Sequence, residues 1–246
     1  MRASSYTKGA PRVVRLIVFL SIALALGLAS GVAAEPSFLN TTGTLLTPDD
    51  SVLGAGDFSA GYHGISFEGA TPNILGANVG INGYLELGIA RLDPDATGAA
   101  IQTALSGKYL ALTETAYRPS LVFGAVDIAG TLDVDKDPGL YAVIGKNLTS
   151  TATSLSGTPS APLRGYVGYG MGIYDGVFGG LTWSLGSRAK LMVEYLHGIS
   201  VVDTLDTESM VNAGLQFAVN DELSAQVAVF DGTDIGFAVN FVKVTQ

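Results

Sequence analysis

The chain contains only two histidines, His63 and His197, and histidine is the usual general base of hydrolases. A lipid hydrolase would need one of them beside a serine nucleophile and an orienting acid. Ser59 and Ser66 flank His63 in the sequence, and His197 follows Glu194. Neither histidine accompanies a nucleophile-elbow sequence, so no catalytic residue is assigned and lipid hydrolysis is kept as the last of three alternatives.

Three aspartates in TLDVDKDPG resemble the start of a calcium-binding loop: Asp133, Asp135 and Asp137. The sixth position of such a loop needs glycine and the twelfth needs glutamate, but Pro138 and Ile144 stand there. The chain has no cysteine, which excludes thiolate metal sites and disulfides. We therefore expect neither a metal nor a cofactor site, and we interpret the aspartates as an exposed loop.

Charged residues inside apolar stretches are the remaining candidates for chemistry. Asp127 and Lys146 lie on neighbouring predicted strands, and we expect them to form an ion pair in a narrow interior. Four other charged residues mostly alternate with apolar ones and are also expected to face inward: Glu86, Lys108, Lys190 and Glu194. Packing and charge compensation are favoured over transport as the role of such a pair.

The elements that position these side chains are indicated by alternation. In the stretch from Val211 to Val244, every second residue is apolar and the residues between are small or polar. This period of two predicts strands with two unlike faces. The same pattern predicts strands over residues 57–65, 72–81, 84–92, 104–112, 119–130, 139–148, 164–173, 176–186, 188–199, 209–220, 222–231 and 234–244.

The chain start resembles a secretory signal peptide. Arg2, Lys8, Arg12 and Arg15 precede an apolar run from Leu16 to Leu28, and small residues lead to Ala34. We therefore expect residues 1–34 to be removed on export. The removed part holds four of the thirteen basic residues and none of the twenty-two acids, so nine basic residues and a net charge of −13 remain. Such acidity argues against a nucleic-acid partner.

An exported, apolar chain without further membrane helices is typical of an outer-membrane barrel, because a closed barrel pairs every backbone group within lipid. The sequence therefore predicts an all-β fold: an antiparallel transmembrane β-barrel of about twelve strands over residues 57–246. The apolar face is expected to contact lipid, with residues 35–56 as a segment that could enter the lumen. Aromatic residues near predicted strand ends are expected to lie at the membrane interfaces: Tyr84, Tyr109, Tyr141, Tyr166, Tyr174, Trp183 and Tyr195. A soluble sandwich with the apolar face inside is the alternative.

Several segments resemble the YjbH-type outer-membrane proteins, which are associated with exopolysaccharide production. They are TTGTLLTPDDSVLGAGDFSAGYH (41–63), FGAVDIAGT (123–131), LYAVIGKNL (140–148), and VFGGLTWSL with AKLMVEYLHG (177–198). The arginine of that family's Gly-Ala-Arg-Asp signature is Val126 here, and this chain is much shorter. The resemblance implies a non-enzymatic role in exopolysaccharide export or surface organisation, with exopolysaccharide and periplasmic export proteins as partners besides outer-membrane lipid.

Two features leave this functional expectation open. A barrel of about twelve strands has a lumen between that of a filled small barrel and an open porin, so a small-solute channel and a purely structural protein remain alternatives. The Ser/Thr/Pro-rich segment 149–163 falls on the periplasmic side, where connections are usually short. It either contacts a periplasmic partner or indicates an error in the strand count.

Overall fold

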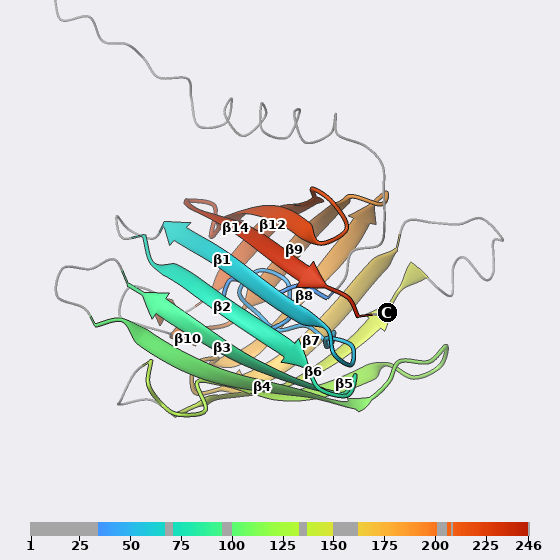
Figure 1. The fold of residues 1–246 in the computed structure, drawn as a ribbon, viewed down its shortest axis with the longest axis horizontal. Helices are drawn as coiled ribbons and strands as arrows, with labels where there is room; N and C mark the ends of the chain where they lie inside the picture. The colour runs from blue at the N-terminus through green and yellow to red at the C-terminus, as the bar shows by residue number, and fades with distance from the viewer. Residues whose placement is uncertain are drawn as a thin grey trace, which may run out of the picture.

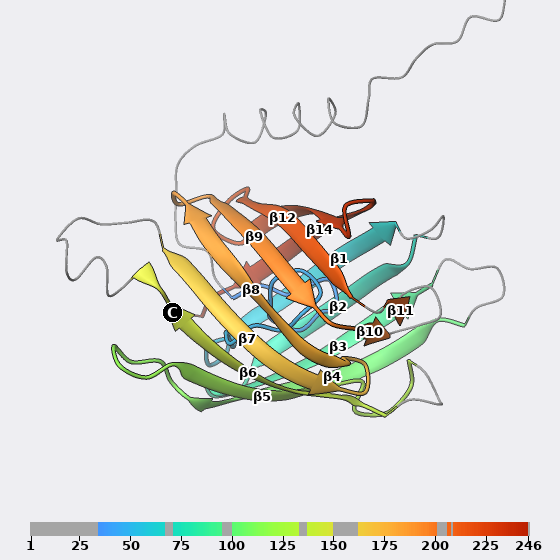
Figure 2. The same ribbon diagram turned by 180° about the vertical axis from the view of Figure 1, so that it is seen from behind.

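The computed structural model describes residues 34–66, 71–94, 100–132, 137–149, 162–200, 206–207 and 209–245. Twelve of the strands in these residues close into one antiparallel barrel, which confirms the predicted fold class (Figure 1, Figure 2). The barrel strands are β1 (Phe58–Ser66), β2 (Asn73–Gly80), β3 (Leu85–Asp93), β4 (Gln102–Leu112), β5 (Ser120–Val126), β6 (Gly139–Asn147), β7 (Leu163–Met171), β8 (Gly176–Leu185), β9 (Ala189–Leu196), β12 (Met210–Ala218), β13 (Leu223–Phe230) and β14 (Asp234–Lys243). A separate ribbon pairs β10 (Ile199–Ser200) with β11 (Asp206–Thr207). No helix among these residues is long and apolar enough to cross a membrane.

Each barrel strand pairs with its neighbour in the chain, with β9 followed by β12, and β1 pairs with β14 to close the sheet. The closing register places Phe58 opposite Lys243 and Tyr62 opposite Val239. Closure leaves no strand edge with unpaired backbone groups, which is what a sheet in a hydrocarbon environment requires.

The up-and-down order gives the barrel two distinct mouths. The terminal mouth is the end where β1 begins and β14 ends, and the distal mouth is the opposite end. Three connections at the terminal mouth are short: residues 81–84, 186–188 and 219–222. The β6 strand ends and the β7 strand begins at this mouth, but residues 150–161 between them fall outside the described part of the chain. Asp133 and Asp135 of the expected loop, and residues 1–33 of the expected signal peptide, also fall outside it.

The apolar side chains of the strands point out of the barrel and the small and polar ones point into it, as the sequence predicted. On β14, the side chain of Val239 is 46% exposed, whereas its neighbour Asn240 is fully buried. The same contrast separates Leu75 from Gly76 on β2. Successive residues of a strand point to opposite faces, so the apolar residues form the outer surface and the small and polar ones face the lumen. A soluble sandwich would place them the other way round.

The aromatic residues divide between the two faces. Tyr84, Tyr109, Trp183 and Tyr195 are exposed on the outside, as expected for an interfacial belt. Tyr141, Tyr166 and Tyr174 are buried inside the barrel, so the prediction that they lie at the interface was wrong. Tyr141 and Tyr166 occupy inward positions of β6 and β7, and Tyr174 folds in from the β7–β8 turn to pack edge-on against Tyr141 at 5.8 Å.

The distal part of the lumen is closed by an apolar cluster. Inward residues near the distal strand ends, such as Ile65, Leu92 and Phe230, are buried together with residues of the N-terminal segment. Glu86 and Lys108 are buried in the terminal part, whereas Glu194 is buried in the distal half of β9, beside Asn212 near the start of β12.

Candidate functional site: the plugged lumen

Residues 35–56, called the plug below, lie inside the barrel and fill its lumen (Figure 1, Figure 2). The plug is a hook with both ends at the terminal mouth. It starts near Ser224, at the beginning of β13, where Ser224 donates a hydrogen bond of 2.5 Å to Glu35. Its tip reaches the distal part of the lumen, where the Phe38 and Phe230 rings pack edge-on at 5.3 Å. The chain then returns, and the N–H of Leu53 donates to Glu86 near the start of β3.

The hook is shaped by its own backbone. Asn40 adopts a left-handed conformation with φ of 68°, which asparagine tolerates better than most residues. Two antiparallel bridges hold the returning chain, between Pro36 and Thr42 and between Gly43 and Pro48. A hydrogen bond of 2.6 Å from the Phe38 N–H to the Leu45 carbonyl joins the two arms.

Glycines on the inner wall make room for the plug. A Cβ atom built on Gly76 would overlap the side chain of Asn40, and one built on Gly145 would overlap the Asp50 carboxylate. Gly107 faces outward, and a Cβ there would come no closer than 3.6 Å to another residue. The wall is therefore shaped to the plug side chains at specific positions.

The carboxylate of Glu194 holds the returning arm of the plug. It is fully buried, and it accepts the N–H groups of Leu46 and Thr47 at 3.1 and 2.8 Å. The hydroxyls of Thr44 and Thr47 donate to it at 2.8 and 2.7 Å, and the Asn212 amide donates at 2.9 Å. These hydrogen bonds offset the free-energy cost of burying the charged carboxylate, so it needs no cationic partner.

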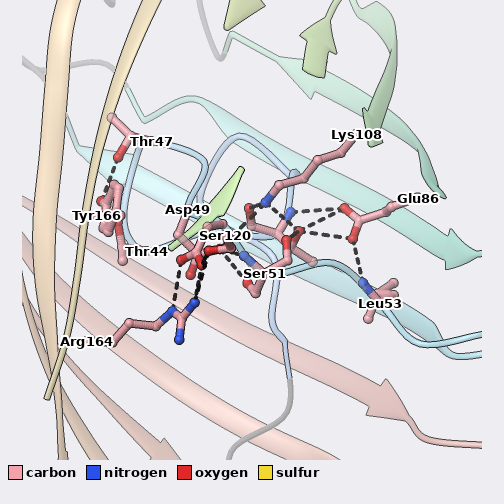
Figure 3. Close-up of polar contacts among 12 residues, drawn as sticks. Thr44, Thr47, Asp49, Ser51, Leu53, Glu86, Lys108, Ser120, Arg164 and Tyr166 are labelled. Atoms are coloured by element: carbon pink, nitrogen blue, oxygen red, sulfur yellow. Dashed lines mark hydrogen bonds and ion pairs between the residues drawn. The ribbon is translucent and has the colours of Figure 1, made fainter. Parts of the chain in front are cut away.

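Glu86 and Lys108 hold the plug from the other side of the lumen, and they face each other in the register of β3 and β4. The Lys108 ammonium donates to the Thr42 carbonyl at 2.6 Å and lies 3.5 Å from the Asp49 carboxylate. Glu86 accepts the Thr42 N–H at 3.2 Å and the Leu53 N–H at 3.0 Å (Figure 3). These two wall residues, predicted to face the lumen, thus anchor both arms of the plug.

A third anchor lies at the terminal mouth. The Arg164 guanidinium binds the Asp50 carboxylate through two nitrogens, one of them at 2.8 Å, and Ser120 donates to the same carboxylate (Figure 3). Arg164 also donates to Glu114 at 2.8 Å, and Lys146 lies 3.4 Å from Glu114. Arg164, Asp50 and Glu114 are not recognisable as partners from the sequence, because no local pattern relates these three positions.

The predicted ion pair between Asp127 and Lys146 is not formed. The register places Val126 opposite Gly139 and Ser120 opposite Gly145, so the two residues lie at opposite ends of β5 and β6, about 26 Å apart along the strands. Strand β5 ends at Val126, and Asp127 turns the chain with φ of 55° and accepts the Leu132 N–H at 2.8 Å. Lys146 occupies an outward strand position, and its ammonium reaches the loop between β4 and β5.

The remaining candidates fall into two groups. Lys190 lies on an inward position of β9, where its positive charge acts on Glu35 and Asp49 of the plug. His63 is fully buried in the lumen, where its ring contacts the Asn240 amide oxygen at 2.8 Å and the Phe38 carbonyl at 3.3 Å. His197 is exposed just after β9. The contacts described for His63 thus involve an amide and a carbonyl instead of a nucleophile and an acid.

Comparisons with known proteins support the fold. No family model and no curated protein matches the chain. Among solved structures, a KdgM porin matches with a TM-score of 0.50 and 9% identity, over 76% of this chain and 99% of that one. A KdgM porin in complex with disordered oligogalacturonate gives the same values. A NanC porin matches with a TM-score of 0.46 and 11% identity, over 77% of this chain and 99% of that one. The chain therefore has a porin-like barrel fold of the outer-membrane type, with a lumen that its own N-terminal segment occupies.

Proposed function

We propose that this protein is a small-solute channel of the bacterial outer membrane, and that the plug closes it at rest. The observation that carries the proposal is how the lumen is filled. The space is occupied by a separate hook of chain, and several inward wall positions beside it are small or polar: Gly76, Gly145, Gln216 and Gln226. A barrel with only a structural role could fill its interior with larger wall side chains.

The topology of the plug supports opening without unfolding. Both arms run to the terminal mouth, and every barrel strand is paired independently of the plug. Withdrawal towards the terminal mouth would break hydrogen bonds and ion pairs but no strand pairing and no covalent bond. The contacts to be broken are concentrated at Glu194, Lys108 and Arg164, so loss of a few interactions would free the hook.

The comparisons agree with this reading at the level of fold. Two porin structures with TM-scores of 0.50 have a similar barrel. The role in exopolysaccharide export rests on the YjbH resemblance alone and stays a prediction. No contact of the described residues favours it over a channel.

An engineered disulfide between plug and wall tests the proposal in the complete protein. The native chain has no cysteine, and the Asp50 side chain reaches the position of a Gly145 Cβ, so Asp50→Cys with Gly145→Cys should bring the two sulfurs within bonding distance. In planar bilayers, we expect the oxidised protein to conduct no ions. Under reducing conditions the same protein lacks the Asp50 anchor and is expected to show open-channel events.

Gly145→Cys alone is the matched control, because its conductance should not respond to the redox state. Heat-modifiable migration on gels checks that each variant is a folded barrel. If the reduced double variant is folded and remains silent, Leu46→Pro provides a second attempt to release the plug, since proline removes an N–H that Glu194 accepts. Folded barrels of both variants without conductance would refute the channel.

A further inference from the structure

The plug carries charge of one sign only. Its ionisable side chains are Glu35, Asp49 and Asp50, and residues 35–56 contain no lysine, arginine or histidine. All three carboxylates are buried, with exposed fractions of 9%, 9% and 3%. A buried carboxylate is stable only where its surroundings compensate the negative charge. The wall residues that do so for the plug therefore indicate which solute charges the lumen could bind.

Basic side chains of the wall contact two of the three plug carboxylates. Arg164 binds Asp50 in a two-nitrogen arrangement, and Lys108 lies 3.5 Å from Asp49. Lys190 acts on both Glu35 and Asp49. Because Asp49 and Asp50 are consecutive, Lys108 on β4 and Arg164 on β7 must lie close enough across the lumen to hold two neighbouring carboxylates at once (Figure 3).

The acidic side chains of the wall are compensated differently. Glu194 accepts N–H and O–H groups of Thr44 to Thr47, and Glu86 accepts those of Thr42 and Leu53. The inward strand positions of the barrel carry three basic and three acidic side chains, and one of the acidic ones, Asp234, lies at the distal end of β14. Removal of the plug would therefore uncover Lys108 without its Asp49 partner and Arg164 with Glu114 in place of Asp50, and it would take the charges of Glu35 and Asp49 away from Lys190.

We infer that the open lumen selects anionic solutes that carry two or more carboxylates, and that Asp49 and Asp50 occupy the positions such a solute takes. This inference rests on the proposed channel function. The guanidinium of Arg164 offers a planar pair of donors that matches a carboxylate, and the ammonium of Lys108 supplies a second charge for the next carboxylate. A dicarboxylate would thus compete with the plug for the same two side chains.

Ion selectivity of the reduced Asp50→Cys/Gly145→Cys protein tests the inference. Under a potassium chloride gradient, the reversal potential should indicate preference for chloride over potassium. Lys108→Gln and Arg164→Gln, introduced together, should move the preference to potassium. Lys243→Gln is the control, because Lys243 is exposed at an outward position at the end of β14 and should leave selectivity unchanged. If the first pair prevents assembly, Lys190→Gln tests the same wall charge and should shift the reversal potential in the same direction.

Solute flux adds a direct readout. In proteoliposomes of the reduced protein, succinate should enter several-fold faster than its uncharged diamide, and the two wall substitutions should abolish this difference. Open channels that prefer potassium, or that pass succinate no faster than the diamide, would overturn the inference while leaving the channel function intact. Absence of any conductance in the reduced, folded protein would instead remove the channel function, and the inference with it.

Discussion

The Glu194 carboxylate on β9 and Thr47 of the plug are joined twice, through the Thr47 N–H at 2.8 Å and its hydroxyl at 2.7 Å. Residues 147 positions apart in the chain thus form the tightest part of a buried anchor. The pairing explains why a glutamate is stable on an inward strand position that is fully buried. It also makes Glu194 the residue whose charge most directly holds the plug inside the barrel.

Neutralising this anchor should destabilise the barrel. Glu194→Gln replaces an acceptor oxygen by an amide that faces the donor groups of Leu46 and Thr47, and we expect a loss of about 2 kcal/mol in unfolding free energy. Urea-induced unfolding in detergent measures it. Glu222→Gln, in the exposed β12–β13 turn, is the matched control and should change stability by less than about 0.5 kcal/mol. Equal stability of the two variants would show that Glu194 is not an anchor.

A methyl group on the inner wall should disturb the plug. Gly76→Ala places a Cβ in the space of the Asn40 side chain, and we expect destabilisation of about 1–3 kcal/mol because the hook must shift. Gly107→Ala on the outer face has room and is expected to be neutral. Protease sensitivity of residues 35–56 gives a second measurement. It should increase in Gly76→Ala only, and unchanged cleavage there would contradict a matched fit between plug and wall.

A charged side chain on the outer surface should reduce the folding free energy in lipid more strongly the deeper it lies in the bilayer. Val239 lies in the middle of β14 and is 46% exposed, so Val239→Lys should cost about 2–4 kcal/mol in lipid. Val244, 55% exposed, follows the end of the same strand, and Val244→Lys is expected to cost about 1 kcal/mol or less. Folding titrations in lipid vesicles compare the two. Similar costs would mean that this face does not contact hydrocarbon.

Asp127 and Lys146 should behave as independent residues. They lie at opposite ends of their strands, so a double-mutant cycle with alanine should give no coupling energy. The pair Lys146 and Glu114, at 3.4 Å and partly exposed, should give about 0.2–1 kcal/mol. Measured coupling between Asp127 and Lys146 would require a different strand register.

The terminal-mouth anchor should weaken in acid. Burial by itself would raise the pKa of Glu114, but the Asn147 N–H and the Arg164 guanidinium stabilise its charged form and hold its pKa below the ordinary value of 4.5. A lowered pKa in the folded state adds stability above the unfolded value, and this stability is lost as pH falls through the folded pKa. The stability difference between the native protein and Glu114→Gln should therefore be constant from about pH 7 to about pH 5 and shrink below about pH 4.5. A difference that persists at about pH 3 would exclude this contribution.

Local alternation determined most of the barrel. Each of the twelve predicted strands overlaps an observed one, and the sense of the two faces followed from the apolar, small and charged residues along them. The period of two reports directly on side-chain direction, and the small inward residues indicated a crowded lumen. The same rule placed Glu86, Lys108, Lys190 and Glu194 on inward positions, because all four lie within regular strands.

The sequence-based predictions were wrong for some residues at or near strand ends. Asp127 leaves the sheet with a positive φ, and Lys146 falls on the outward parity of β6. The end of β5 depends on pairing with other strands, which no single segment specifies. Lys146 shares the parity of the exposed Leu140 and Ile144, so alternation within β6 itself directs it outward. Tyr141 and Tyr166 were assigned to the interface from their place near predicted strand ends, although the alternation of their own strands directs them inward.

Only the tertiary structure decided what fills the lumen and which charges meet there. Thr47 reaches Glu194 across 147 positions of the chain, and Asp50 reaches Arg164 across 114. The partners come together because closure of the barrel brings β3, β4, β7 and β9 around the same enclosed space. The sequence by itself thus determined the wall, through the side-chain direction of each strand. Closure determined the plug site, because a buried carboxylate or ammonium is stable only where another part of the fold supplies its hydrogen-bond and charge partners.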